Sequence, residues 1–280
     1  MYFGILTPNF GYCCGSSRSL AELAHEAENS GWDGFYIFDH ILYTLDERVP
    51  LVDPWIALTA IAMNTKRVRI GPMVTPLARR LPWELARQTT SIDHLSDGRL
   101  TLGVGLGDPA DVEFTSIGEN STDKVRAAKL EEGLNVLAGL WRGEPFSYLG
   151  KHYQLRNAQF LPRPLQSPRI PVWVAGRWPR RRPFLRAALW DGVFPLGLAR
   201  GSRLSPDEIK SVVSFIGNQR AEKSPYDVVA TSGASGQVDD EETLRAYSEA
   251  GATWWLEDMR RWSNSTQELG KRIRKGPPEI

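Results

Sequence analysis

Residues 93–108 read DHLSDGRLTLGVGLGD, and this stretch decides how the chain is interpreted. Its first residues end an amphipathic segment, Pro82–Leu95, whose spacing predicts a helix. Leu100–Gly107 is a mostly apolar run that ends in glycines, which is typical of a strand buried on both faces. Such strands belong to parallel sheets covered by helices. The stretch therefore predicts one helix-to-strand step of an α/β fold.

The same alternation continues on both sides of this stretch. Short runs of β-branched and aromatic residues alternate with amphipathic segments of helical spacing. Strands are expected at Tyr2–Thr7, Phe35–Asp39, Arg67–Thr75, Leu100–Gly107, Pro171–Ala175, Gly192–Pro195, Tyr226–Ser232 and Ala252–Glu257. Helices are expected at Ser19–Asn29, Trp55–Met63, Pro82–Leu95, Asp123–Trp141, Arg182–Leu189, Ser205–Glu222, Asp239–Ala250 and Ser265–Arg274.

This alternation of eight strands with eight helices predicts a single (β/α)8 barrel, the TIM-barrel fold of the α/β class. No linker rich in Pro, Gly or Ser divides the chain, so residues 1–280 are expected to form one domain. An open doubly wound sheet would carry G-x-G-x-x-G after the first strand, where this chain has TPNFG. A hairpin excursion is expected near residues 144–158, where Leu149-Gly150 joins two short alternating runs.

Composition argues against several classes of protein. Of the 280 residues, 41% are hydrophobic and 24% are charged, which fits a globular chain with a sizeable core. The net charge of +1 argues against nucleic-acid binding and against a surface built for anionic membranes. The sequence contains no readable secretory signal or membrane span, so the cytoplasm is the expected location. Cys13 and Cys14 are adjacent, which suits neither a disulfide nor a metal site.

Candidate catalytic residues follow two of the predicted strands. Barrel enzymes place their sites at the C-terminal ends of strands, where this chain has Asp39-His40 and Asp108. A histidine beside a carboxylate suits proton transfer near neutral pH, and Asp108 is a second candidate acid. Structural roles are the alternative: His40 as a satisfied polar residue, and Asp108 as a cap of the turn into Pro109.

Several motifs at these strand ends resemble the bacterial luciferase-like superfamily of flavin- and deazaflavin-dependent oxidoreductases. The motifs are FYIFDH (35–40), IGPMVTPL (70–77), DHLSDGRLTLGVGLGD (93–108), EEGLNVLAGLW (131–141) with GKHYQL (150–155), and PVWVAG (171–176). They cover the chain from Met1 to about Pro195, while the last third agrees only in its strand–helix rhythm.

The resemblance implies a tricyclic ring cofactor, F420 or FMN, that lies across the mouth of the barrel. His40 would lie near its reactive face with Asp39 beside it, and Asp108 would be a further proton donor. Val74 would press against the ring from a bulge in the third strand, with a cis peptide at Met73–Val74. The cofactor-binding residues implied are His40, Met73, Val74, Thr75, Gly105, Leu106, Gly107, Asp108, Ala175, Gly176 and Arg177, the last three receiving the phosphate.

Arginines in the loops after three strands favour F420, which carries a phosphate and a glutamate chain, over FMN, which carries one phosphate. They are Arg79, Arg80, Arg177, Arg180, Arg181, Arg182, Arg200 and Arg203. Leu106 also departs from family members with a phosphate-binding arginine in this glycine stretch, which argues against their mode of FMN binding. FMN would imply monooxygenation with oxygen, and F420 would imply hydride transfer.

Aromatic residues on or near the rim predict a small apolar or aromatic substrate. They are Phe10, Tyr12, Tyr43, Trp55, Trp178 and Trp254 or Trp255. Two other functions stay open: a non-catalytic flavin-binding barrel, and a sugar-phosphate enzyme whose phosphate loop is Ser232–Gly236. The resemblance also implies a homodimer paired through Pro54–Met63 and Pro82–Leu95, since the first helix is apolar nearly all round.

Overall fold

The computed structural model describes residues 1–46, 48–119, 122–221, 224–234 and 240–279. Parallel strands form one sheet in the order β3-β2-β1-β11-β10-β9-β8-β5-β4. Their bounds are β1 (Tyr2–Thr7), β2 (Gly34–Ile37), β3 (Arg69–Pro72), β4 (Thr75–Pro76), β5 (Leu102–Gly105), β8 (Val172–Arg177), β9 (Gly192–Leu196), β10 (Asp227–Thr231) and β11 (Trp254–Asp258). Since β3 and β4 are two parts of one barrel strand, the predicted α/β barrel is confirmed.

The barrel closes where β3 meets the segment that leads into β5. Ile70 N donates to Arg99 O at 3.1 Å, and Thr101 N donates to Ile70 O at 2.9 Å. A Cβ on Gly71 would lie 1.9 Å from Thr101 O, and a Cβ on Gly103 would lie 2.3 Å from Pro72 O. The two main chains approach this closely because glycine stands on both sides of the seam.

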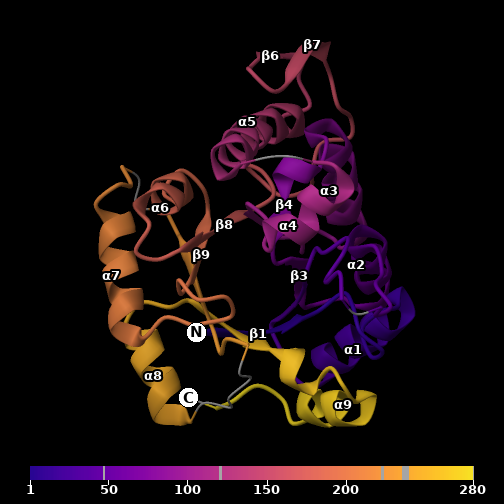
Figure 1. The fold of residues 1–280 in the computed structure, drawn as a ribbon, viewed down its shortest axis with the longest axis vertical. Coiled ribbons are helices and arrows are strands. Elements are labelled where there is room, and N and C mark those ends of the chain that lie inside the picture. The colour runs from indigo at the N-terminus through magenta and orange to yellow at the C-terminus, as the bar shows by residue number, and fades with distance from the viewer. Residues whose placement is uncertain (47, 120–121, 222–223, 235–239, 280) are drawn as a thin grey trace.

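Helices surround the sheet (Figure 1). Their bounds are α1 (Ser17–Asn29), α2 (Pro54–Asn64), α3 (Pro82–Leu95), α5 (Asp123–Trp141), α6 (Arg181–Ala187), α7 (Pro206–Gly217), α8 (Glu241–Glu249) and α9 (Thr266–Arg274). Each of them overlaps one predicted helix. The predicted ends at Glu222 and Asp239 fall outside the described residues.

Three local features differ from the sequence prediction. The third strand does not run unbroken over Arg67–Thr75, because Met73 and Val74 separate β3 from β4; the peptide between them is cis, as the resemblance implied. The second strand ends at Ile37, so Asp39 and His40 lie in the loop beyond it. The short helices were not predicted, since they have no periodicity to detect: α4 (Ala110–Glu113), η1 (Leu77–Arg79), η2 (Thr115–Ile117) and η3 (Met259–Trp262).

Three aromatic rings fill the interior of the barrel. The ring of Trp173 lies 5.3 Å from that of Tyr36 and 5.4 Å from that of Trp254, measured between centroids. Trp254 is therefore part of this interior packing, and its expected place near the rim is wrong. The side chains of Leu6 and Phe194 belong to the same cluster and line the cavity above it. The barrel is thus a packed core with a cavity at its mouth.

The predicted hairpin is confirmed and stands on the outer side of α5 (Figure 1). Its strands are β6 (Phe146–Leu149) and β7 (Gln154–Ala158). The carboxylate of Glu132, on α5, accepts hydrogen bonds from the backbone N–H groups of residues 151–153 at 2.8 to 3.1 Å. The turn is therefore fastened to α5 by one side chain, while Leu149 beside it is 85% exposed.

We expect Gly71→Ala to lower the free energy of unfolding by about 3 kcal/mol or more, because the new methyl group would meet a backbone oxygen that cannot move aside. Gly217→Ala is the matched control, because a Cβ at this helix position meets nothing within 4 Å. The control is expected to be neutral or to stabilise by up to ~1 kcal/mol. Chemical denaturation of both variants measures the difference, and equal midpoints would show that the seam is not tight.

Candidate active site

A cavity of about 390 Å³ opens at the C-terminal ends of the barrel strands. Eleven of the twelve residues expected to be catalytic or cofactor-binding line it: Asp39, His40, Met73, Val74, Gly105, Leu106, Gly107, Asp108, Ala175, Gly176 and Arg177. Thr75 does not reach the cavity. Its side chain is buried, and its hydroxyl donates to Asp39 Oδ2 at 2.8 Å.

His40 is fixed through both its backbone and its ring. Asn9, which follows β1, donates from Nδ2 to His40 O at 2.8 Å and accepts at Oδ1 from His40 N at 3.3 Å. The ring Nδ1 lies 2.6 Å from Glu113 Oε1. A carboxylate can only accept, so Nδ1 carries the proton of this contact. Nε2 has no hydrogen bond to a described residue, and it is the ring nitrogen left for a ligand in the cavity.

Glu113 is the cavity residue beside His40 that the sequence interpretation missed. It ends the four-residue helix α4, and its side chain is fully buried although it lines the cavity. No sequence period or motif singles it out. The one signal is its place shortly after the fourth barrel strand, in a loop that lines the mouth cavity.

The side chain of Asp39 holds arginines rather than facing the ring of His40. Its carboxylate accepts from Trp55 Nε1 at 3.2 Å, from Thr75 Oγ1 at 2.8 Å, and from Arg80 Nε and Nη2 at 3.1 and 2.7 Å. Burial raises the pKa of Asp39, but the charges of Arg80 and Arg79, together with hydrogen bonds from Arg80 and Thr75, outweigh burial and hold that pKa below its usual value. The carboxylate beside His40 is therefore that of Glu113, and Asp39 is a buried anchor.

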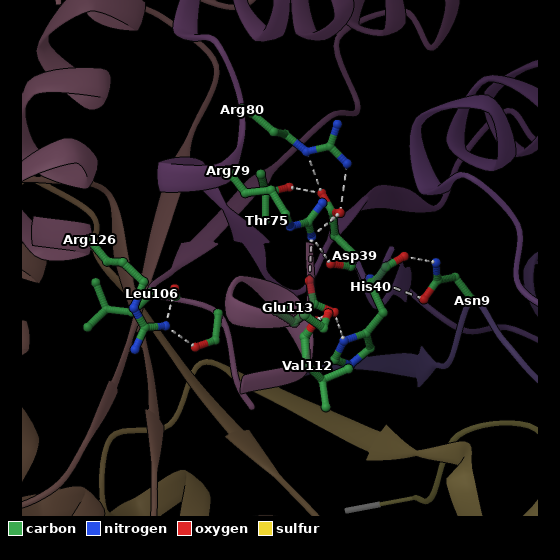
Figure 2. Close-up of polar contacts among 12 residues, drawn as sticks. Asn9, Asp39, His40, Thr75, Arg79, Arg80, Leu106, Val112, Glu113 and Arg126 are labelled. Atoms are coloured by element: carbon green, nitrogen blue, oxygen red, sulfur yellow. Dashed lines mark hydrogen bonds and ion pairs between the residues drawn. The ribbon is translucent and has the colours of Figure 1, made fainter. Parts of the chain in front are cut away.

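Arg79 joins the two carboxylates. Its Nη2 lies 3.1 Å from Asp39 Oδ1 and 3.0 Å from Glu113 Oε2, and it donates to Asp39 O at 2.8 Å. Figure 2 shows the resulting chain of contacts from Arg80 through Asp39, Arg79 and Glu113 to His40. Arg79 and Arg80 are thus paired with buried carboxylates. The sequence-based prediction that they belong to an anion-binding rim is wrong.

Three aromatic rings surround the ring of His40. Phe10, Phe38 and Tyr43 each have a centroid 5.7 Å from it, at edge-to-face angles, and Phe10 stacks on Tyr43 at 3.6 Å. The other aromatic residues expected near the rim are not part of this group around His40. Trp55 donates a hydrogen bond to Asp39, and Trp178 packs against Phe184. Tyr12 is exposed to solvent, and Trp255 is buried in the core.

The glycines of the mouth make room for neighbouring side chains. A Cβ on Gly105 would lie 2.6 Å from Val74 Cγ2, and a Cβ on Gly107, whose φ is +83°, would lie 2.7 Å from Phe114. A Cβ on Gly176 would lie 2.5 Å from Pro183. Glycine is needed at these positions for packing, whatever contact their backbone makes with a ligand.

Asp108 is ion-paired at the rim. Arg177 Nη2 donates to Asp108 Oδ2 at 2.9 Å, and Arg200 Nε lies 3.6 Å from the same oxygen. Arg177 also donates from Nη1 to the carbonyl oxygens of residues 197–199. Arg180 lines the cavity too, and its exposed side chain has no ion pair within the described ranges.

Arg126, a second residue that was not predicted, supports the loop before α4. Its Nη1 donates to Leu106 O at 2.9 Å (Figure 2) and to Gly107 O at 2.7 Å. Its side chain reaches from α5, where Asp123 pairs with it. The backbone at Leu106 is therefore held from outside the barrel, and with it the loop that carries Glu113.

The described residues contain no group of three His, Cys, Asp or Glu placed to hold a metal ion. No helix within them is long and apolar enough to cross a membrane. Of the alternative phosphate loop, Ser235 and Gly236 lie outside the described residues. Ser232 in that loop is buried, and its hydroxyl accepts from Asp258 N at 2.9 Å.

Curated relatives share about a third of the aligned sequence. An F420-dependent glucose-6-phosphate dehydrogenase from Amycolatopsis mediterranei is 33% identical over 217 residues, covering 76% of this chain and 63% of the relative. The enzyme of that name from Mycobacterium avium is 32% identical over 166 residues, 58% of this chain and 48% of the relative. The alignments thus span less than two thirds of the length of these relatives.

Solved structures share the fold at low sequence identity. An F420-dependent secondary alcohol dehydrogenase with an F420-acetone adduct has a TM-score of 0.75 and 16% identity over 98% of each chain. The F420-dependent tetrahydromethanopterin reductase from Methanopyrus kandleri has a TM-score of 0.72 and 18% identity, covering 96% of this chain and 97% of its own. The model of the luciferase-like monooxygenase family matches residues 1–277. The chain therefore belongs to the luciferase-like monooxygenase family.

Proposed function

We propose that this chain is an F420-dependent oxidoreductase that acts on a small organic alcohol or carbonyl compound. The observation that carries the proposal is His40: Glu113 fixes its Nδ1 at 2.6 Å, while Nε2 is left unpaired on the wall of the mouth cavity. A ring held in one orientation with one free nitrogen is suited to general acid–base work.

The residues at the mouth fit such a cofactor. The cavity of about 390 Å³ is within the usual range for cofactor and ligand sites. Leu6, Met73 and Val74 offer an apolar floor, while Arg180 after β8 and Arg200 after β9 offer N–H donors for a phosphate or carboxylates. Gly105 would let its backbone approach the ring beside Val74, as the resemblance implied.

When bound, F420 supplies a two-electron hydride acceptor or donor. The contribution of the chain is to orient the substrate and to move one proton. Nε2 of His40 would take the hydroxyl proton as an alcohol becomes a carbonyl, and would return it in the reverse direction. The buried carboxylate of Glu113 would hold the ring and stabilise its positive charge while the proton is there.

The relatives support F420 over FMN, since those at about a third identity are named as F420-dependent enzymes. Leu106 points the same way, as does Arg180, which lines the cavity without an ion pair to a described residue. A monooxygenase that uses reduced FMN is the second candidate, because structural neighbours include an FMN-bound Baeyer-Villiger monooxygenase with a TM-score of 0.65. A non-catalytic flavin-binding barrel would have no need of the His40–Glu113 pair.

The remaining sequence-based expectation is a cytoplasmic homodimer. On α2, Ile56 is 62% exposed and Met63 is 68% exposed, although the other face of this helix is buried. A pair of large apolar side chains on one outer helix face is typical of a surface that a second copy covers.

We expect the purified protein to bind F420 with a Kd well below ~1 mM and more tightly than FMN. Arg180→Ala is expected to weaken F420 binding about tenfold, because a charged hydrogen bond to an anion is lost. Arg182→Ala is the matched control, since this neighbouring arginine does not line the cavity. Fluorescence titration measures all three proteins. Failure of both cofactors to bind below millimolar concentration would contradict the proposal.

We expect His40→Ala to keep the fold and most of the F420 affinity but to lower turnover by about 10²–10⁴-fold, the usual contribution of general acid–base catalysis. His152→Ala, in the turn of the hairpin, serves as the control and should leave turnover unchanged. The comparison is made at equal cofactor saturation. Wild-type rates in both variants would make His40 a structural histidine.

We expect sedimentation at tens of micromolar to give a dimer, and Ile56→Glu to give a monomer, because a charge on α2 would be buried in the proposed interface. Leu149→Glu, at the exposed turn of the hairpin, should remain dimeric. A monomeric wild-type protein would rule out this interface.

A further inference from the structure

The charged residues that line the mouth cavity divide it into two halves. Five of its arginines come from the elements around β5, β8 and β9: Arg126, Arg177, Arg180, Arg186 and Arg200. His40 follows β2, which lies on the other side of the barrel between β3 and β1, with β11 next to β1. On that side, Arg260 after β11 is the arginine that lines the cavity among the described residues.

The charge of Arg260 is neutralised by Asp258, two residues earlier in the chain. Asp258 ends β11, is buried, and accepts from Arg260 Nε at 3.0 Å and from Nη2 at 2.6 Å. The same carboxylate accepts from the backbone N–H of Arg260 at 3.0 Å, so it also caps η3. This bidentate pairing leaves the two residues with no net charge.

Aromatic surface encloses the pair on the side toward His40. The guanidinium of Arg260 lies over the ring of Phe38 at 5.2 Å, and the ring of His40 lies 5.7 Å from the same ring at its edge. Tyr43 is the third member of this wall. Burial lowers the pKa of Arg260, but the hydrogen bonds and the charge of Asp258 outweigh burial and raise that pKa, so the guanidinium stays charged and paired.

We propose that the Asp258–Arg260 pair makes the His40 half of the cavity select an uncharged alcohol or carbonyl compound with an apolar or aromatic body. The inference rests on the proposed function and names its substrate class. A phosphorylated substrate would bring a doubly charged anion to a guanidinium whose charge is already balanced by a buried carboxylate. Glucose 6-phosphate, which appears in the names of the relatives, is therefore not the substrate expected for this chain.

Asp258 is then the specificity-determining residue. Removing its charge, while keeping its shape, would leave Arg260 with an unbalanced positive charge beside the substrate. An Asn side chain still accepts one hydrogen bond from Arg260 and can still cap η3, so the guanidinium would stay near its place. The variant should therefore gain affinity for anions that the wild-type protein rejects.

The test is calorimetric titration of wild-type protein and Asp258→Asn with three probes: 1-phenylethanol, 4-(1-hydroxyethyl)benzoate and glucose 6-phosphate. We expect wild type with F420 to bind the neutral alcohol at least about tenfold more tightly than either anion, and Asp258→Asn to tighten both anions at least about tenfold with little change for the alcohol. Asp240→Asn is the control, because Asp240 caps α8 in the same way but does not line the cavity.

The titrations are repeated without F420. Anions that bind to the arginines around β5, β8 and β9 are then expected to bind equally tightly to both proteins. The difference between wild type and Asp258→Asn then still reports on Arg260, even if F420 does not bind and the proposed function fails. Tighter binding of glucose 6-phosphate than of 1-phenylethanol by the wild type would overturn the inference while leaving hydride transfer intact. Unchanged anion affinity in Asp258→Asn would overturn it as well.

Discussion

The contact of Arg79 with two buried carboxylates is the interaction on which the site depends. One guanidinium nitrogen lies within 3.1 Å of Asp39 Oδ1 and 3.0 Å of Glu113 Oε2, and both side chains are fully buried. Without this guanidinium, the negative charges of the two buried carboxylates would not be balanced. A buried charge without a partner strongly lowers the stability of a protein. Arg79 thus ties the end of the second strand to α4, and through Glu113 it sets the direction of the His40 ring.

Much of this architecture could be predicted from the sequence, because each barrel strand and helix spans several turns or alternations of clear period. The position of His40 at a strand end followed from the same reasoning. The partner of His40 did not, for a physical reason: neighbours in an extended segment point to opposite sides, so Asp39 is the residue least suited to face His40. Glu113 lies on a single helical turn, where the sequence has no period to read.

The arginines show the same limit of sequence reasoning. Their number in the rim loops suggested a basic surface, but the fold gives four of them a carboxylate: Asp39 for Arg79 and Arg80, and Asp108 for Arg177 and Arg200. A sequence shows which residues are charged but not which of them form ion pairs. The electrostatic field that acts on a ligand depends on the charged side chains that have no ion-pair partner. The near-zero net charge of the whole chain is consistent with this pairing.

The fastening of the hairpin turn to α5 by Glu132 has a practical consequence for engineering. All three of its hydrogen bonds are to backbone N–H groups, so they constrain the path of the turn and not the identity of its side chains. None of the residues from 144 to 158 lines the mouth cavity. The exposed position of Leu149 therefore offers an attachment point for a fluorophore or a surface tether, one that leaves the barrel mouth open to solvent.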